Sequence, residues 1–284
     1  MRRTGKKLSI EKCSKGHRHH VDGWQGKLSA VLIVLMVLPL PASALDLFTL
    51  WRQPMLPLHM IVGSWVDYNT VSQAEGKRSE NLVRIQCISR FGDEKSGGWI
   101  VEIVPLHERN GSLTPVLGEG LRLYLSQRLL RRDADLKHVI ERVERWQDGR
   151  ATELPPAEWR ENPFVASSLK AEFAPDSSEL VSSSIRVVSG REIPCDHFQM
   201  TATDTQRVTL PKGQLEQVSR WEITTAINAN VPFLGIVFAA ERTYAESRLH
   251  PPSERFTPPP PVTRIETMEL IGYGNEAAPI LEVR

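Results

Sequence analysis

Short runs of β-branched and aromatic residues, separated by turn-forming residues, constrain the fold of this 284-residue chain more than any other feature. Between positions 121 and 125, leucines alternate with Arg122 and Tyr124, as in a strand with one face in water. Runs of the same kind occupy residues 65–68, 82–88, 98–104, 184–188, 193–202, 206–210, 218–223, 232–241 and 264–273. We therefore expect an α+β protein that is mostly antiparallel β, with one strongly curved sheet (an unclosed barrel) and one or two helices packed against it.

The stretch 133–150 has two readings. Its apolar residues recur at helical spacing, which favours a helix: Leu136, Val139, Ile140, Val143 and Trp146. The alternative is a pair of strands joined at Asp148-Gly149, a typical hairpin turn. The arginines in and before this stretch alternate with acidic residues, so we expect them on a solvated, salt-bridged face: Arg128, Arg131, Arg132, Arg142 and Arg145.

The first 44 residues have the order of an export signal. A basic stretch precedes 13 uncharged residues from Leu28 to Leu40, and Ala42-Ser43-Ala44 then offers the small side chains that signal peptidase accepts. The apolar run is shorter than the roughly 20 residues of a permanent membrane helix, so we favour cleavage over an uncleaved anchor. We expect a periplasmic or extracellular protein whose membrane contact is limited to this N-terminal segment.

Beyond the leader, we expect an apolar lead-in over residues 45–62 and one β-rich domain over residues 63–284. That domain contains a Ser- and Pro-rich linker at 154–184 and a proline-rich loop at 248–261, which cannot form a ladder. The leader holds 8 of the 35 Lys and Arg and 2 of the 34 Asp and Glu residues, which leaves 27 basic against 32 acidic. A net charge of −5 without a basic stripe argues against a nucleic-acid partner.

Two cysteines follow the leader, Cys87 and Cys195, and each lies in a strand-like run. In an oxidising compartment they can pair, and a bridge over 108 residues would stabilise the fold by about 4–5 kcal/mol. The alternative is two buried free thiols that act as small hydrophobes. A possible metal cluster of Cys13, His17, His19 and His20 lies inside the leader, where no folded scaffold fixes its geometry, so we predict no metal site.

No catalytic motif is specific enough to assign an activity or a cofactor. The Ser167-x-x-Lys170 spacing lacks the partner motifs of the serine enzymes that use it. Cys195 and His197 form a conceivable nucleophile–base pair, which leaves an extracytoplasmic hydrolase as one alternative. We expect a non-enzymatic protein, with no catalytic residue assigned.

Several segments together resemble bacterial periplasmic lipoprotein carriers of the LolA/LolB type and their uncharacterised relatives. They are Gly63-Ser-Trp-Val-Asp-Tyr68, Gly98-Trp-Ile-Val-Glu102, Gly190-Arg-Glu-Ile-Pro-Cys195, Val218-Ser-Arg-Trp221, residues 230–241 with Val231-Pro232-Phe-Leu-Gly235, and Met268-Glu-Leu-Ile-Gly-Tyr-Gly274. The resemblance covers residues 60–275 in outline. It implies an unclosed barrel with helices in its mouth, whose apolar concave face holds acyl chains.

On this resemblance, the expected partner is a lipid, a lipoprotein or another apolar ligand. The strand tryptophans Trp65, Trp99 and Trp221 are the candidate contacts, with ordinary core packing as the alternative for each. A further alternative is an envelope interaction protein that uses the proline-rich loop. The sequence does not determine the oligomeric state.

Overall fold

The computed structural model describes residues 50–53, 55–93, 97–161, 177–210, 213–250 and 260–282. All of them belong to one compact unit, Pro41–Arg284. The predicted leader with its Cys–His cluster, the Ser167–Lys170 pair, much of the linker and most of the proline-rich loop lie outside the described residues.

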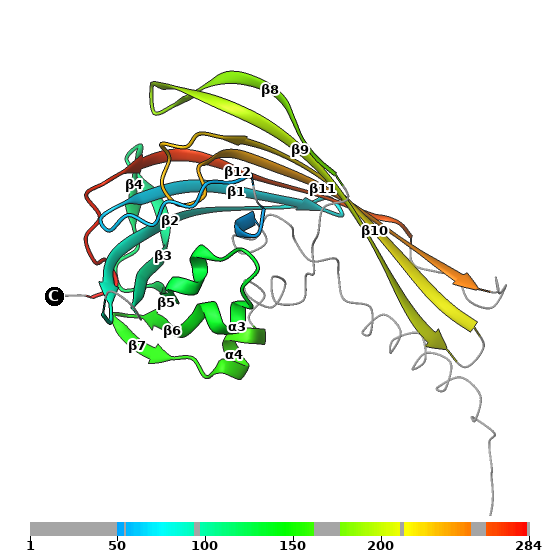
Figure 1. Cartoon of the computed structure of the whole chain (residues 1–284), viewed down its shortest axis with the longest axis horizontal. Coiled ribbons are helices and arrows are strands. Elements are labelled where there is room, and N and C mark those ends of the chain that lie inside the picture. The colour runs from blue at the N-terminus through cyan, green and yellow to red at the C-terminus, as the bar shows by residue number, and fades with distance from the viewer. Residues whose placement is uncertain are drawn as a thin grey trace, which may run out of the picture. The chain divides into compact units, whose positions relative to one another are not determined.

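The described chain forms one large antiparallel sheet, which Figure 1 shows as strongly curved. Its strands are β1 (Trp65–Ala74), β2 (Lys77–Phe91), β3 (Gly98–Arg109), β4 (Ser112–Pro115), β5 (Gly120–Ser126), β6 (Ile140–Gln147), β7 (Arg150–Glu153), β8 (Ser177–Val188), β9 (Arg191–Leu210), β10 (Gly213–Ile227), β11 (Ile236–His250) and β12 (Val262–Gly274). The order across the sheet is β7-β6-β5-β3-β2-β1-β12-β11-β10-β9-β8, with β4 paired to β3. The first strand therefore pairs with the last, and among the described strands β7 and β8 form the two edges.

The predicted α+β class is wrong, because the described chain is almost entirely antiparallel β. Besides the helical residues 50–51, the described helical elements are the 3-10 turn η1 (Gln127–Leu130), α3 (Leu136–Val139) and α4 (Pro156–Glu161), of which α4 has six residues. The helix expected over 133–150 is a hairpin instead, with β6 and β7 joined at Asp148-Gly149. Both turn residues have positive φ, 51° and 71°, as a tight hairpin turn requires. Strand pairing, which places Val143 beside Leu123, outweighs the helical spacing.

Side chains alternate between two faces of the sheet, and we define each face by its residues. The inner face carries most of the hydrophobic core, including Val66, Tyr68, Ile85, Cys87, Val101, Ile103, Leu123, Leu125, Trp221, Ile223, Met268 and Leu270. The outer face of β1 to β5 carries polar and charged side chains instead: Asp67, Arg84, Gln86, Glu102 and Arg122.

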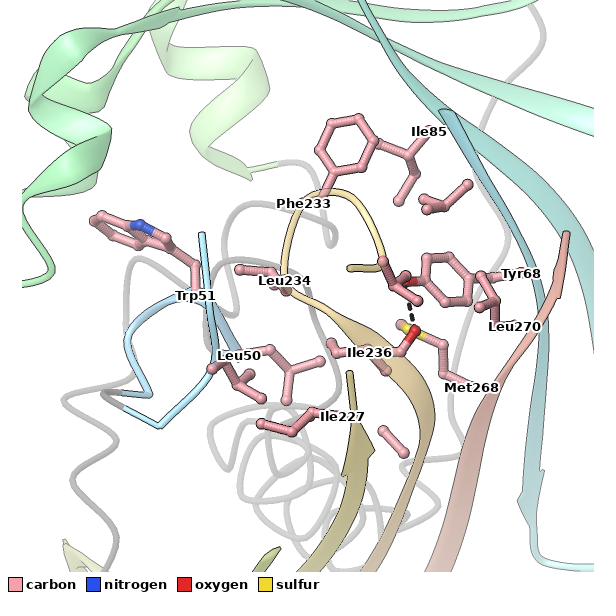
Figure 2. Packing of buried hydrophobic residues seen from close by; sticks show 14 of the residues in the cluster. Leu50, Trp51, Tyr68, Ile85, Ile227, Phe233, Leu234, Ile236, Met268 and Leu270 are labelled. Atoms are coloured by element: carbon pink, nitrogen blue, oxygen red, sulfur yellow. Dashed lines mark hydrogen bonds between the residues drawn. The ribbon is translucent and has the colours of Figure 1, made fainter. Parts of the chain in front are cut away.

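A short irregular layer covers part of the inner face, and we call it the inner plug. It consists of the described residues between 50 and 60 together with the loop 228–235. Its buried side chains are Leu50, Trp51, Leu56, Val231, Phe233 and Leu234. Figure 2 shows Phe233 beside Ile85 of β2, and Leu50 and Leu234 towards Ile227 and Ile236 at the ends of β10 and β11. The Tyr68 hydroxyl donates to the Ile236 carbonyl at 3.0 Å, just beyond the loop.

Candidate ligand-binding site

Arg132 ties the N-terminal half of the inner plug to the segment after β5. Its guanidinium donates hydrogen bonds to the backbone carbonyls of Trp51, Gln53 and Leu56. The Trp51 indole N–H also donates to the Leu129 carbonyl at 2.8 Å. Burial lowers the pKa of Arg132. The expectation of a solvated, salt-bridged face is therefore wrong for Arg132, although Arg131 does pair with Asp133 at the surface.

The two halves of the inner plug join through a strained loop residue. Phe233 has a φ of 63°, which is rare for a bulky side chain and costs of order 1–3 kcal/mol. His59 holds it there with two backbone hydrogen bonds of 2.8 and 3.0 Å. At Gly235 (φ 68°) a Cβ atom would come within 2.4 Å of the Pro57 side chain, so only glycine permits this contact. Backbone strain of this kind gathers where a structure has a second conformation or a ligand to accommodate.

The structure places the three candidate tryptophans on two faces. Trp99 on β3 and Trp221 on β10 are buried in the inner-face core, with β2, β1, β12 and β11 between their strands. Trp65 points to the outer face, where it packs against Gly272 and Gly274 and lies 4.2 Å from the Arg84 guanidinium. Of the three, Trp99 and Trp221 therefore lie on the inner face, and Trp65 lies on the outer face.

Cys87 and Cys195 are both buried free thiols, and the structure does not bring them together. Cys87 lies on β2 and Cys195 on β9, with four strands between them, or roughly 24 Å along the sheet at about 4.8 Å per strand. A disulfide needs Cα atoms within about 7 Å of each other. Burial raises the pKa of Cys87 to about 12 and also raises that of Cys195.

The chemistry considered for Cys195 and His197 has little support in this geometry. A nucleophilic cysteine needs a lowered pKa, whereas burial raises that of Cys195, whose thiol donates to the Ile193 carbonyl at 3.4 Å. The His197 ring nitrogen Nε2 instead lies 2.6 Å from the Ser184 hydroxyl. Within the described ranges, no group of three or more His, Cys, Asp and Glu side chains could hold a metal ion.

The outer face contains a buried polar network that the sequence analysis missed. Arg122 donates to Glu102 at 2.7 Å and to Glu282 at 3.0 Å, and the Gln86 amide donates to Glu102 at 2.8 Å. Burial by itself lowers the pKa of Arg122, but the two carboxylates outweigh it and hold that pKa above its usual value. The available signal was Glu102 itself, a charge inside the apolar run 98–104.

Comparisons with known proteins leave the family open, since no protein family and no curated protein matches the sequence. A Bacteroides fragilis protein with a YmcC-like fold, described as exported, shares 8% identity and a TM-score of 0.28. That match covers 77% of this chain and 100% of the other. A DUF1329 family protein from Desulfovibrio piger shares 11% identity and a TM-score of 0.25, over 73% of this chain and 85% of the other. At such scores the likeness carries no argument about function.

In the part of the chain that the structure describes, no helix combines the length and the apolar character needed to cross a membrane.

Proposed function

We propose that this is an exported, non-enzymatic protein that binds a lipid, a lipoprotein acyl chain or a similar apolar ligand on the inner face of its sheet. The observation that carries the proposal is the nature of the cover on that face. Among the described residues, that cover is a short segment between 50 and 60, helical only at residues 50–51, together with the loop 228–235. A second sheet or long helices would instead form a permanent layer. The leader pattern of residues 1–44 supports the export part of the proposal.

The energetics allow an acyl chain to replace the N-terminal half of the inner plug, the described residues between 50 and 60. Re-exposing Leu50, Trp51 and Leu56 would cost roughly 6–9 kcal/mol, at about 2–3 kcal/mol for each large apolar side chain. Burying a chain of fourteen methylenes would return about 11 kcal/mol at about 0.8 kcal/mol each. This half of the inner plug therefore covers the apolar inner face in place of a ligand and keeps water away from it until an acyl chain binds.

Mass spectrometry of organic extracts tests the proposal. Protein expressed with its leader and purified without detergent should carry a near-stoichiometric lipid, and protein stripped by unfolding and refolding should take up added palmitate. The stripped sample before addition is the lipid-free control. Folded protein that yields no lipid and takes up no palmitate would rule out the proposed role.

A further inference from the structure

The last described residues, 275–282, cross the outer face of the sheet without joining its ladder, and we call them the C-terminal strap. One backbone bond links the strap to the segment before β1, from the Ala277 N–H to the Gly63 carbonyl at 2.6 Å. Its other polar contacts are made by side chains of the sheet. Gln86 donates to the Ala278 carbonyl at 2.8 Å, Glu102 accepts from the Ile280 N–H at 3.0 Å, and Arg122 binds the Glu282 carboxylate.

The three side chains that hold the strap are buried, and two of them, Glu102 and Arg122, are charged, which is costly for a purely structural contact. Glu102 is 0% exposed, Gln86 1% and Arg122 6%. A buried ion pair contributes little net stability compared with apolar residues of the same volume. A peptide-binding site commonly has such elements. They are side chains that hydrogen-bond the backbone N–H and C=O groups of an extended segment, and an arginine beside them that binds a carboxylate.

The strap also lies very close to the sheet at two glycines, Gly120 and Gly63. Leu281 is fully buried, and a Cβ atom at Gly120 would lie 3.2 Å from its Cδ2 and 2.4 Å from the Ile103 carbonyl. At Gly63, with a φ of 88°, a Cβ atom would lie 2.9 Å from the Asn275 carbonyl. Both glycines therefore allow the close approach of the strap, and Leu281 is the apolar side chain that it buries beside Gly120.

One polar atom of this site is left over when the strap is bound. The Gln86 amide nitrogen donates both to Glu102 and to the strap, which fixes the orientation of the amide, and its Oε1 has no hydrogen-bond partner although it is buried. A buried acceptor without a donor costs about 1–3 kcal/mol. The strap thus leaves one buried acceptor of this site without a donor.

We propose that this outer-face groove is a peptide-binding site, held in cis by the C-terminal strap and able to accept instead an extended segment of another protein. The contacts define the segment. It supplies backbone groups to Gln86 and Glu102, an apolar side chain beside Gly120, and an acidic side chain directly after it to Arg122. The site lies on the face opposite the proposed lipid site and does not depend on it.

Fluorescence anisotropy with a labelled synthetic peptide of residues 275–284 tests this site in the full chain. Leu281→Asp should unseat the strap, so the variant should bind the peptide at least tenfold more tightly than the wild type. Adding Arg122→Met should abolish the gain, whereas adding Arg78→Met, an exposed arginine on β2, should not. A peptide with lysine in place of Glu282 should bind at least tenfold more weakly. A folded Leu281→Asp variant that binds no better than the wild type would overturn the proposal.

Two further measurements test the same proposal without the Leu281→Asp variant. Glu282→Lys changes a side chain that is 59% exposed, so it should fold normally and still raise peptide affinity, because it removes the Arg122 contact of the strap. In the wild type, the Ala277 and Ile280 amides should exchange hydrogen through local opening, much faster than the amides of β3. Exchange of these two amides only through global unfolding would show that the strap never leaves the groove, and would contradict the proposal.

Discussion

Two ion pairs of this chain have similar chemistry and opposite surroundings. Glu102 and Arg122 are almost completely buried between β3 and β5, whereas the side chains of Arg131 and Asp133 are 73% and 76% exposed. When one residue of a buried ion pair is replaced, the other charge keeps its desolvation cost without the compensating attraction. When one residue of an exposed pair is replaced, the other charge is simply hydrated by water. Glu102→Gln should therefore lower the free energy of unfolding by about 3 kcal/mol, measured by urea denaturation.

The matched control for this prediction is Asp133→Asn, which should change the free energy of unfolding by less than about 0.5 kcal/mol. Equal effects of the two variants would mean that the buried network is not formed in solution.

The thiol of Cys87 makes a prediction about reactivity and pH. Because burial raises its pKa from 9.0 to about 12, its thiolate fraction at pH 8 should fall about a thousandfold. Mass spectrometry after iodoacetamide treatment should find Cys87 unmodified in native protein and modified in guanidinium. The unfolded thiol ionises first, so stability should decrease as the pH rises from about 9 towards 12. A Cys87–Cys195 linked peptide, or rapid native alkylation of Cys87, would contradict this description.

At the scale of elements, the sequence predicted most strands correctly, but it also predicted a helix over 133–150 where the structure has the β6–β7 hairpin. Alternation identified the strand around Leu121–Leu125 because each residue there has a fixed face. In 133–150 the apolar residues follow helical spacing and not strand alternation: Val143 pairs with Leu123 on the inner face, whereas Trp146 lies against Arg122 on the outer face. The pairing with β5 that decides in favour of a strand is not visible locally. Only the Asp148-Gly149 turn indicated the observed hairpin.

That turn gives a prediction for the β6–β7 hairpin. Gly149→Val should destabilise the protein by about 1–2 kcal/mol, because valine resists the positive φ of 71° that the turn imposes. Asp148→Asn should be nearly neutral, since asparagine tolerates positive φ. Thermal denaturation followed by circular dichroism compares the two, and a neutral Gly149→Val would argue against this turn.

The inner plug gives a prediction about access to the inner face. Arg132→Met removes the hydrogen bonds to three plug carbonyls, which should raise the fraction of molecules with an open inner face. Apparent affinity rises in proportion to that fraction, so a fluorescent palmitate analogue should bind at least threefold more tightly.

Arg131→Met, which alters the exposed neighbour, is the control for the plug and should leave the affinity unchanged. Unchanged or weaker binding by Arg132→Met would show that the plug does not restrict entry.

At the scale of the whole molecule, the arrangement depends on contacts between distant segments. The pairing of β1 with β12 joins residues about two hundred positions apart, and the plug reaches from residue 50 to the loop at 228–235. Alternation within each run predicts strands and faces but cannot specify which strands become neighbours. For the same reason Trp65, Trp99 and Trp221 were grouped as one site, although the register places Trp65 on the opposite face.

Quenching of tryptophan fluorescence by a brominated fatty acid tests the central claim, that an apolar ligand binds on the inner face. Bromine quenches only tryptophans close to it, and Trp51 of the inner plug also lies on the inner face, so it is first changed to phenylalanine. In this Trp51→Phe background the chain should lose most of its quenching when both Trp99 and Trp221 are changed to phenylalanine. Trp65→Phe, the outer-face control, should leave the quenching almost intact. No quenching, or quenching that disappears with Trp65→Phe and survives the double change, would contradict an acyl chain on the inner face.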